Sequence, residues 1–553
     1  MILADYIAKF LDDLRVRHIF MLSGTGSVRL DDAFARNPNI EYVCARHEAT
    51  AVVMASAAAK VSGNIGVAVV TTGPGGANAI AGAVEAWVDS VPLMIISGQA
   101  KSNDIVDDRS FGVQGFNIID TVQQFTKYAV KINNPQMIKY ELEKSIHAAF
   151  SGRPGPVWVD IPEDFQNVDL NLDQLKSFHV TAKEQAMDMS CLEQFARLYN
   201  ASKKPCIIFG QGVKFSNTTA KLTSMSSALG IPTISSRMAN DLLSSFENYF
   251  GMGGIRGDKI ATKIMHESDL FICLGTSNPI TLLDRSLTKS SKIVSVNIDD
   301  VAHFKGDVNI DLSIKMDLSC FFESLDTKKL KFDNKNWLAF CKNMASKYAI
   351  SEMVSKENPI NSYYFAYCLS ELTNEKHVFV NDAGSSNYIC SQGLRFNSGQ
   401  TEVTSGAFYT MGLALPLAIG AAVSLIDKQI IVITGDGSIE LNIQELQTIN
   451  LLKLNVKVFV INNGGYASIR DSQDAMCGGR YTDSEQILNF EKIADAFGLG
   501  FSIIRDVSEI KEVVERELQS TQPSIIEVVC DSKQHMFQPV IELANEEEYC
   551  DIG

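Results

Sequence analysis

The sequence lacks the features that mark several large classes of protein. It has no Lys- or Arg-rich run that could follow a nucleic-acid backbone, and its 49 basic and 65 acidic residues give a net charge of −16. Its eleven cysteines include no C-x-x-C pair, so neither a zinc site nor a disulfide framework is expected. Its longest apolar stretches, such as residues 413–425, fall short of the ~20 residues that span a bilayer. We therefore expect a cytoplasmic protein that binds neither nucleic acid nor a membrane.

What the sequence does contain is a regular alternation of short apolar runs and stretches with helical spacing. At 553 residues the chain is too long for one core, since a domain averages ~150 residues. Stretches such as residues 49–62 and 140–151 have helical spacing, and strands that alternate with helices favour parallel sheets covered on both faces. The apolar runs, bounded by Gly, Pro or Asn, cover residues 66–70, 92–96, 156–160, 206–209, 270–274, 293–297, 377–380, 430–433, 456–460 and 525–529.

Two polar segments interrupt this alternation. Residues 167–187 and 326–361, the second rich in Lys and Asn, are predicted linkers. We therefore predict an α/β protein of three doubly wound parallel-sheet domains at residues 1–165, 186–325 and 355–535. The first and third domains are candidates for a shared fold.

The most informative pattern lies in the third predicted domain. Gly435-Asp436-Gly437-Ser438 follows one apolar run, and Asn462-Asn463-Gly464-Gly465 follows the next. Mg²⁺ prefers oxygen ligands and takes only a few of them from protein. The Asp436 carboxylate, the Asn463 amide oxygen and the Gly465 carbonyl would supply such a set, and Gly437-Ser438 lets backbone N–H groups approach a diphosphate. Either motif alone is more often an ordinary turn.

In this order and spacing, the two motifs resemble the cofactor signature of thiamine-diphosphate enzymes. The resemblance implies thiamine diphosphate, Mg²⁺ and a catalytic Glu in the first domain that engages N1′ of the aminopyrimidine. Residues 42–51, Tyr-Val-Cys-Ala-Arg-His-Glu-Ala-Thr-Ala, match the context of that Glu, and a Gly-Pro-Gly turn follows at residues 73–75. Glu48 is therefore the candidate catalytic residue. Taken alone, it would be an ordinary glutamate at a helix N-terminus.

The same resemblance assigns further residues to the cofactor. Residues 405–416 resemble the segment that bends it, with Met411 between its two rings and the Tyr409 carbonyl at the aminopyrimidine edge, although a Met before Gly is more often a core residue. Residues 382–387 lie where the family contacts the diphosphate. The complete set of cofactor candidates is Glu48, Pro74, Asn78, Ser385, Ser386, Asn387, Tyr409, Met411, Gly435, Asp436, Gly437, Ser438, Asn463, Gly465, Tyr466 and Ala467, and the metal candidates are Asp436, Asn463 and Gly465.

From Phe20 to about Val529 the chain resembles acetolactate-synthase-like enzymes, which implies a homodimer or homotetramer with sites between subunits. Gln114 is retained and is a candidate to orient the donor or intermediate. The pair of histidines typical of pyruvate decarboxylases is absent, because Phe111-Gly-Val-Gln-Gly115 stands there. The chain departs from true synthases at Val113, Glu163, Asn278 and Ser472, where two aromatic and two cationic residues are replaced. These losses should weaken selection for a second small 2-oxo acid.

Within this family the chain most resembles the branch found with surface-polysaccharide genes, typified by the carboligase of yersiniose-like sugars. The resemblance rests on residues 24–32, 86–92, 112–115, 152–158 and 462–470. It implies that pyruvate is decarboxylated and its two-carbon unit is passed to a nucleotide-linked 4-keto sugar, so that the enzyme is a lyase or transferase. Acetolactate synthase and simple 2-oxo acid decarboxylase activities are alternatives. A catalytically silent binding subunit is a further one, although it should have lost Glu48, Asp436 or Asn463.

Two expectations concern the remaining ligands. FAD is implied in the central domain, where residues 251–257, Gly-Met-Gly-Gly-Ile-Arg-Gly, resemble part of a flavin site and Asn278 does not. Arg470 and Arg256 are candidates to bind an anionic acceptor, with a solvated surface arginine as the alternative for each.

Overall fold

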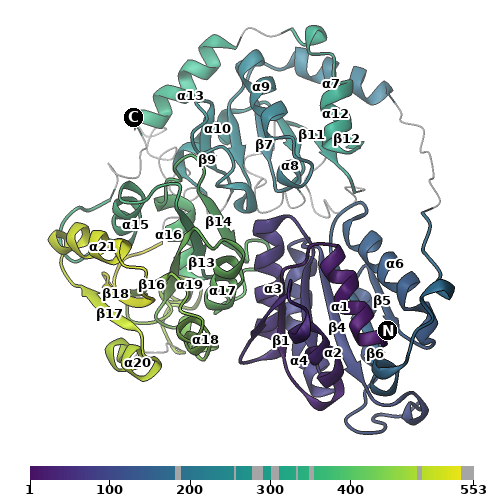
Figure 1. The fold of residues 1–553 in the computed structure, drawn as a ribbon. Helices are drawn as coiled ribbons and strands as arrows, with labels where there is room; N and C mark the ends of the chain where they lie inside the picture. Colours follow the sequence, from purple (N-terminus) through teal and green to yellow (C-terminus); the bar gives the residue numbers. More distant parts are fainter. Residues whose placement is uncertain are drawn as a thin grey trace.

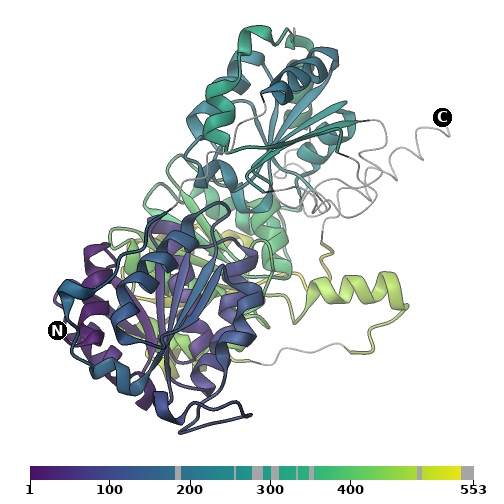
Figure 2. The ribbon, with the colours of Figure 1, turned by 90° about the vertical axis from the view of Figure 1, so that its right-hand side faces the viewer.

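The computed structural model describes residues 1–180, 189–254, 257–276, 291–299, 310–331, 334–347, 354–482 and 488–536. It contains three six-stranded sheets, and every strand pair in them is parallel. Helices cover the sheets, and the three domains form three lobes around a common junction (Figures 1 and 2). The predicted α/β class with three doubly wound parallel-sheet domains is confirmed.

The first domain has the strand order β2-β1-β3-β4-β6-β5. Its inner strands are buried along their whole length, which is why they are continuous apolar runs in the sequence. Its strands are β1 His18–Leu22, β2 Glu41–Cys44, β3 Gly66–Val70, β4 Leu93–Gln99, β5 Tyr128–Lys131 and β6 Pro156–Pro162. Its helices are α1 Leu3–Asp13, α2 Val28–Arg36, α3 Glu48–Ser62, α4 Pro74–Val88, α5 Ile118–Val122 and α6 Ile138–Phe150.

The third domain repeats this arrangement with the order β14-β13-β15-β16-β18-β17, so the first and third domains share one topology. Its strands are β13 His377–Asn381, β14 Thr401–Thr404, β15 Gln429–Gly435, β16 Val456–Asn462, β17 Gly500–Ile504 and β18 Ser524–Val529. Its helices are α15 Ser362–Glu371, α16 Ser385–Gly393, α17 Ala414–Ser424, α18 Glu445–Leu451, α19 Ala467–Cys477, α20 Phe490–Phe497 and α21 Ile510–Gln519.

The central domain has a different order, β12-β11-β10-β7-β8-β9, in which the chain reverses its direction of winding between β7 and β10. Ligands of open α/β sheets bind at such a switch point, outside the carboxyl ends of the strands. Its strands are β7 Pro205–Phe209, β8 Thr233–Ser235, β9 Tyr249–Met252, β10 Leu270–Leu274, β11 Lys292–Asn297 and β12 Leu312–Lys315. Its helices are α7 Ser190–Ala201, α8 Gly212–Phe215, α9 Thr219–Leu229, α10 Lys259–Glu267, α12 Leu318–Ser324 and α13 Lys335–Lys347.

Helix α13 lies inside the segment 326–361 that the sequence analysis treated as a linker, and this part of the interpretation was wrong. The Trp337 side chain is buried, and its Nε1 donates a 3.0 Å hydrogen bond to the Pro205 carbonyl at the start of β7. Trp337 and Cys341 are one helical turn apart and belong to the same apolar cluster of the central domain. The Lys and Asn residues around them concealed this short apolar stripe.

The first and third domains are held together by α3 and α17. The two helices lie so close that a Cβ on Gly420 would come within 2.0 Å of the Met54 carbonyl oxygen. Beside them, the buried Glu445 carboxylate accepts hydrogen bonds from the Thr50 hydroxyl at 2.6 Å and the Arg46 N–H at 2.8 Å. These contacts fix the N-terminal end of α3 relative to the third domain.

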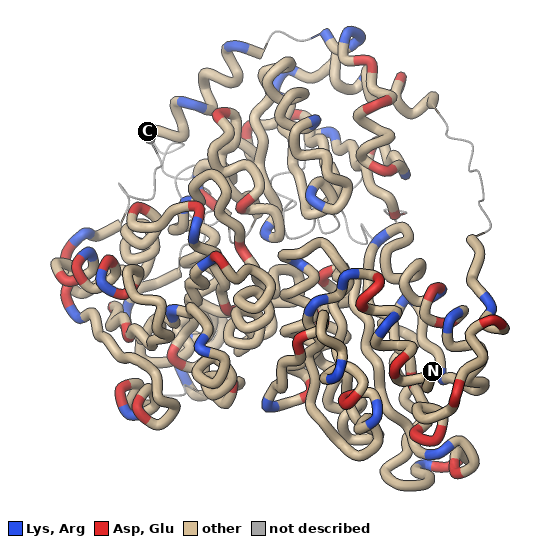
Figure 3. Tube along the Cα trace, in the orientation of Figure 1, with Lys and Arg blue, Asp and Glu red and all other residues tan. Residues whose placement is uncertain are grey.

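Charged side chains of both signs are interspersed over all three domains (Figure 3). Among the described residues, no helix combines the length and the apolar character needed to cross a membrane.

Candidate active site

The two motif loops of the third domain meet at the carboxyl edge of its sheet. Asp436 follows β15 and Asn463 follows β16, which are neighbouring strands. One oxygen of the buried Asp436 carboxylate accepts the Gly437 N–H at 2.9 Å, and the other accepts the Gly465 N–H at 2.8 Å. Burial raises the pKa of Asp436 to about 6, although these backbone hydrogen bonds oppose the shift. The carboxylate therefore joins both loops.

Several buried polar atoms of the Asn463 loop and of the first turn of α16 have no hydrogen-bond partner within the described part of the chain. They are Asn463 Oδ1, Ser386 Oγ and both amide atoms of Asn387. Such groups cost free energy unless something satisfies them, so their clustering indicates a binding site for a polar ligand. Ser385 begins α16, whose first N–H groups favour an anion, and its hydroxyl accepts from the Asn463 amide at 3.4 Å.

Other cofactor candidates of this domain lie around the same loops. Gly437 must be a glycine, because a Cβ there would lie 2.3 Å from the Tyr466 ring. Ser438 is buried at the end of the Asp436 loop. Ala467 begins α19, and its N–H donates to the Gly465 carbonyl at 3.0 Å, which leaves that oxygen one further lone pair. The structure therefore brings together ten of the candidates of this domain: Ser385, Ser386, Gly435, Asp436, Gly437, Ser438, Asn463, Gly465, Tyr466 and Ala467.

The segment 405–412 is held from both sides. Tyr409 adopts a left-handed backbone conformation with φ of 59°. Its neighbour Thr410 donates from its hydroxyl to Glu85 of α4 at 2.7 Å, and the Gly412 N–H donates to Asp382 at 2.7 Å. The half-buried Met411 lies between these two anchors. The segment is thus fixed by carboxylates from both the first and the third domain.

Glu48 is the first residue of α3 and is only 8% exposed. Its Oε2 accepts a 3.0 Å hydrogen bond from Nδ2 of Asn78 on α4. Its Oε1 lies over the turn that begins α4, 3.6 Å from where a Cβ of Gly75 would stand. Glu48, Pro74 and Asn78 are therefore adjacent, as the sequence analysis expected.

Gln114 lies on a tight loop that packs against this turn. Phe111 and Gly115 exchange two backbone hydrogen bonds of 3.1 and 2.9 Å, and Gln114 has a φ of 59°. A Cβ on Gly73 would come within 1.9 Å of the Gln114 carbonyl oxygen, so the two backbones are in contact. Non-glycine residues in left-handed conformations are costly and concentrate at functional sites.

Of the two arginines that the sequence analysis named as candidate acceptor contacts, the structure describes only Arg470. Arg256 lies outside the described residues, as does Asn278. Arg470 is buried, and its guanidinium donates to the Asn463 and Gly464 carbonyls at 2.8 Å each. It therefore contacts the loop beside Asp436 and is not a solvated surface arginine, and its role toward an anionic acceptor stays a prediction. Sequence reasoning missed the contact with this loop, since only the fold shows which carbonyls the side chain reaches.

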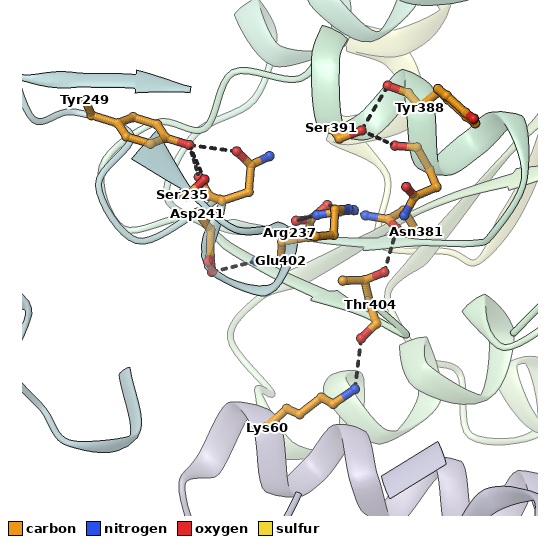
Figure 4. A network of polar contacts seen from close by, with 12 residues as sticks. Lys60, Ser235, Arg237, Asp241, Tyr249, Asn381, Tyr388, Ser391, Glu402 and Thr404 are labelled. Atoms are coloured by element: carbon orange, nitrogen blue, oxygen red, sulfur yellow. Dashed lines mark hydrogen bonds and ion pairs between the residues drawn. The ribbon is translucent and has the colours of Figure 1, made fainter. Parts of the chain in front are cut away.

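A cavity of ≈ 960 Å³ lies where the three domains meet. It opens at the carboxyl edge of the central sheet, where Gly212 and Gly275 follow β7 and β10, and it reaches Tyr388 of α16 and Tyr409. Beside it, the Arg237 guanidinium forms a buried two-point ion pair with Glu402 at 2.5 and 2.8 Å (Figure 4). This ion pair joins the central domain to β14, the strand that precedes the segment 405–412.

Lys60 of α3 extends the same network into the first domain (Figure 4). Its ammonium group donates to the Thr404 carbonyl at 2.9 Å and pairs with Asp89 at 2.7 Å. Asp89 in turn accepts the Ala407 N–H at 3.0 Å. All three domains therefore hold the strand that leads into the segment 405–412.

The first and third domains have one topology. The first carries the buried Glu48 beside a glycine turn, and the third carries the Asp436 carboxylate and the Asn463 amide at the edge of its sheet. This combination defines a thiamine-diphosphate-dependent enzyme. Three family models agree. The N-terminal TPP-binding domain of thiamine pyrophosphate enzymes matches residues 1–132, the central domain matches 192–325, and the C-terminal TPP-binding domain matches 382–528.

Relatives narrow the class further. The chain is 29% identical over 545 residues to the acetolactate synthase large subunit of Lactococcus lactis subsp. lactis, covering 97% of this chain and 93% of that protein. It is 28% identical over 561 residues to the chloroplastic acetolactate synthase of Arabidopsis thaliana, covering 97% and 82%. It is 27% identical over 546 residues to the acetolactate synthase of Mycobacterium bovis, covering 95% and 87%. The chain belongs to the acetolactate-synthase-like family of thiamine-diphosphate-dependent carboligases and transferases.

Proposed function

We propose that the enzyme decarboxylates pyruvate on thiamine diphosphate anchored by Mg²⁺ and transfers the two-carbon unit to an acceptor carbonyl. The observation that carries this proposal is the set of buried, unpartnered polar atoms of Ser386 and Asn387 on α16 and of Asn463 in the loop that Asp436 holds. A magnesium-bound diphosphate has the charge and the oxygen atoms to satisfy them. The bound cofactor supplies a nucleophilic carbon and an electron sink that permits CO₂ to leave a 2-oxo acid.

The chain's own residues have three tasks in this reaction. Asp436, Asn463 and the Gly465 carbonyl hold the metal, while Ser385 and the Gly437-Ser438 backbone hold the diphosphate. Glu48 holds a proton at the aminopyrimidine. Asn78 donates to Oε2 of Glu48, which leaves Oε1 of Glu48 available for this task.

We also propose that the site is shared between two subunits of a homodimer, or of a tetramer built from such dimers. Large apolar side chains beside the site residues are strongly exposed in the single chain: Val113, Phe408, Leu441 and Ile469 are between 50% and 75% exposed. Exposed apolar residues that gather around one region mark interaction surfaces. A second copy of the chain would cover them.

The proposed acceptor is a nucleotide-linked 4-keto sugar. Val113 and Ser472 are exposed, and each is smaller than the aromatic residue that true synthases carry there, which leaves room on the acceptor side. Acetolactate synthase is the second candidate, because the relatives described above bear that name. Mass spectrometry after incubation with thiamine diphosphate, Mg²⁺ and pyruvate, with and without the sugar, distinguishes the two. Acetolactate without any sugar adduct would favour the synthase, and turnover of neither kind would contradict both.

FAD is the proposed occupant of the cavity at the domain junction. The cavity lies at the switch point between β7 and β10, where doubly wound sheets bind nucleotides, and its volume suits a ligand of that size. Arg153 and Lys214 line it and offer positive charge for a diphosphate group. The visible absorption spectrum of the purified enzyme tests this, and a spectrum without flavin bands removes FAD from the proposal.

A further inference from the structure

Arg470 is the fourth residue of α19, a helix that projects from the third domain (Figure 2). Of the residues in this helix only Ala467 and Arg470 are buried. Nη1 of Arg470 donates to the Gly464 carbonyl at 2.8 Å and Nη2 to the Asn463 carbonyl at 2.8 Å. Nη2 also lies 3.5 Å from the Ser532 carbonyl, in the segment that follows β18.

The loop that Arg470 contacts has little rigidity of its own. Gly464 and Gly465 both have positive φ, at 74° and 117°, and glycine loses the most conformational freedom when it is ordered. A planar guanidinium presents several N–H donors in a fixed fork, so it can hold two successive carbonyls in one orientation. While both carbonyls accept from Arg470, the Asn463 side chain lies beside Ser385, to whose hydroxyl its Nδ2 donates at 3.4 Å, and its Oδ1 has no partner among the described residues.

We propose that Arg470 is a positioning residue for the metal loop: it holds the Asn463-Gly464 backbone so that the Asn463 amide oxygen and the Gly465 carbonyl converge on Asp436. This inference rests on the proposed magnesium site. It makes Arg470 act through the loop rather than on the substrate. Partners that orient metal ligands in this way typically contribute 10–100-fold to metal affinity.

An electrostatic role and a positioning role of Arg470 predict opposite changes in Mg²⁺ affinity when the residue is replaced. A positive guanidinium near the site repels the cation, so a purely electrostatic role predicts tighter Mg²⁺ binding when the charge is removed. A positioning role predicts weaker binding. A lysine keeps the charge but cannot form the two-carbonyl fork, so Arg470→Lys separates charge from geometry.

The next residue provides a matched control. Asp471 lies on the same turn of α19, but its carboxylate accepts the Met536 N–H at 2.8 Å and contacts His535 Nδ1 at 2.8 Å. It therefore ties α19 to the C-terminal segment without contacting the metal loop. Asp471→Asn tests whether any general loosening of α19 has the same consequence.

The experiment measures cofactor binding by the full-length apo-enzyme rather than turnover. At a fixed thiamine diphosphate concentration, Mg²⁺ is titrated and binding is followed by intrinsic fluorescence. Arg470→Met and Arg470→Lys should both raise the half-saturating Mg²⁺ concentration, by ~10–100-fold for Arg470→Met. Asp471→Asn should match the parent enzyme. The melting temperature of each apo-protein shows whether the fold is intact, and Arg470→Lys carries the test if Arg470→Met does not fold.

The outcomes separate this inference from the proposed function. If the Arg470 variants need no more Mg²⁺ than the parent, or less, the positioning role is overturned while the magnesium site stands. If Asp471→Asn shifts the titration equally, the effect belongs to α19 as a whole and the inference is again overturned. If the parent enzyme binds thiamine diphosphate without any dependence on Mg²⁺, the proposed function itself fails.

Discussion

Asn78 on α4 donates a 3.0 Å hydrogen bond to the carboxylate of Glu48, the first residue of α3. The bond joins the helix that follows β2 to the helix that follows β3. It fixes the orientation of the glutamate before any ligand is present. The role of Glu48 can therefore be tested separately from the role of its orientation.

Glu48→Gln should lower kcat at least ~100-fold, because a positioned acid or base contributes that much or more and an amide cannot exchange the proton. Asn78→Ala should cause a smaller loss, since the carboxylate remains but is free to turn. Steady-state pyruvate consumption measures both. Glu41→Gln on β2 is the control, because its side chain is 86% exposed and its carboxylate lies 3.8 Å from His18. Full activity in Glu48→Gln would refute the assignment.

Gly73→Ala should displace Gln114. Gly73 has a φ of 59°, and the added Cβ would meet the Gln114 carbonyl at 1.9 Å. Gly63→Ala is a matched control, because Gly63 also has a positive φ, of 71°, but nothing lies within 4 Å of its Cβ position. By urea unfolding, Gly63→Ala should lose about 1–2 kcal/mol from its left-handed backbone, and Gly73→Ala should lose more, because its Cβ also meets a backbone oxygen. Only Gly73→Ala should also lower kcat, and equal activities would show that the Gln114 loop tolerates the shift.

Asp160 should make stability depend on pH. Burial raises its pKa to about 7, although hydrogen bonds from Ser97 at 2.6 Å and Gln99 at 2.9 Å oppose the shift. Between the unfolded value near 4 and about 7, the folded chain holds a proton that the unfolded chain has released. Stability contributed by this group is therefore present at low pH and is lost as pH rises through that window, by at most ~1.4 kcal/mol per pH unit.

Asp160→Asn removes this titration while retaining a group of similar shape. The difference in unfolding free energy between parent and variant, measured by urea denaturation at several pH values, should therefore change across the window from about 4 to 7. A difference that stays constant with pH would show that Asp160 keeps an ordinary pKa.

Breaking the Arg237–Glu402 pair should be costly. Both side chains are buried, and Arg237→Met would leave the Glu402 carboxylate with its Asn381 contact but without a counter-charge. The expected loss is about 3–5 kcal/mol by urea denaturation. Replacing both partners, as Arg237→Met with Glu402→Gln, should recover part of it. A double variant that is no more stable than Arg237→Met would indicate that packing, rather than charge, accounts for the loss.

The sequence predicted the inner strands well, and the physical reason is burial. Runs such as residues 270–274 and 456–460 are apolar at nearly every position because both faces of the sheet are covered, and they became β10 and β16. Most of the strands it did not identify lie at sheet edges, and the exceptions are the inner strand β1 and the three-residue β8. β5 is half-buried along its length, and β12 alternates between buried and exposed residues. Half-covered strands carry a weaker hydrophobic signal.

In the candidate site, too, some features could be predicted from the sequence and others could not. Asp436 and Glu48 could be predicted, because they stand in local motifs whose spacing is visible in the sequence. The hydrogen bond from Asn78 to Glu48 spans 30 positions, and that from Arg470 to the Asn463 carbonyl depends on α19 lying against its own preceding loop. Neither contact is encoded by a local pattern. Supporting interactions of this kind therefore required the structure.

The first and third domains share one strand order, and their site residues follow equivalent strands. Glu48 follows β2 and the turn at Gly73 follows β3, while the segment 405–412 follows β14 and Asp436 follows β15. Equivalent strand ends of two domains with one topology thus carry the predicted site residues. Under the proposed function neither domain acts alone, so substitutions in one domain are constrained by the geometry of the other.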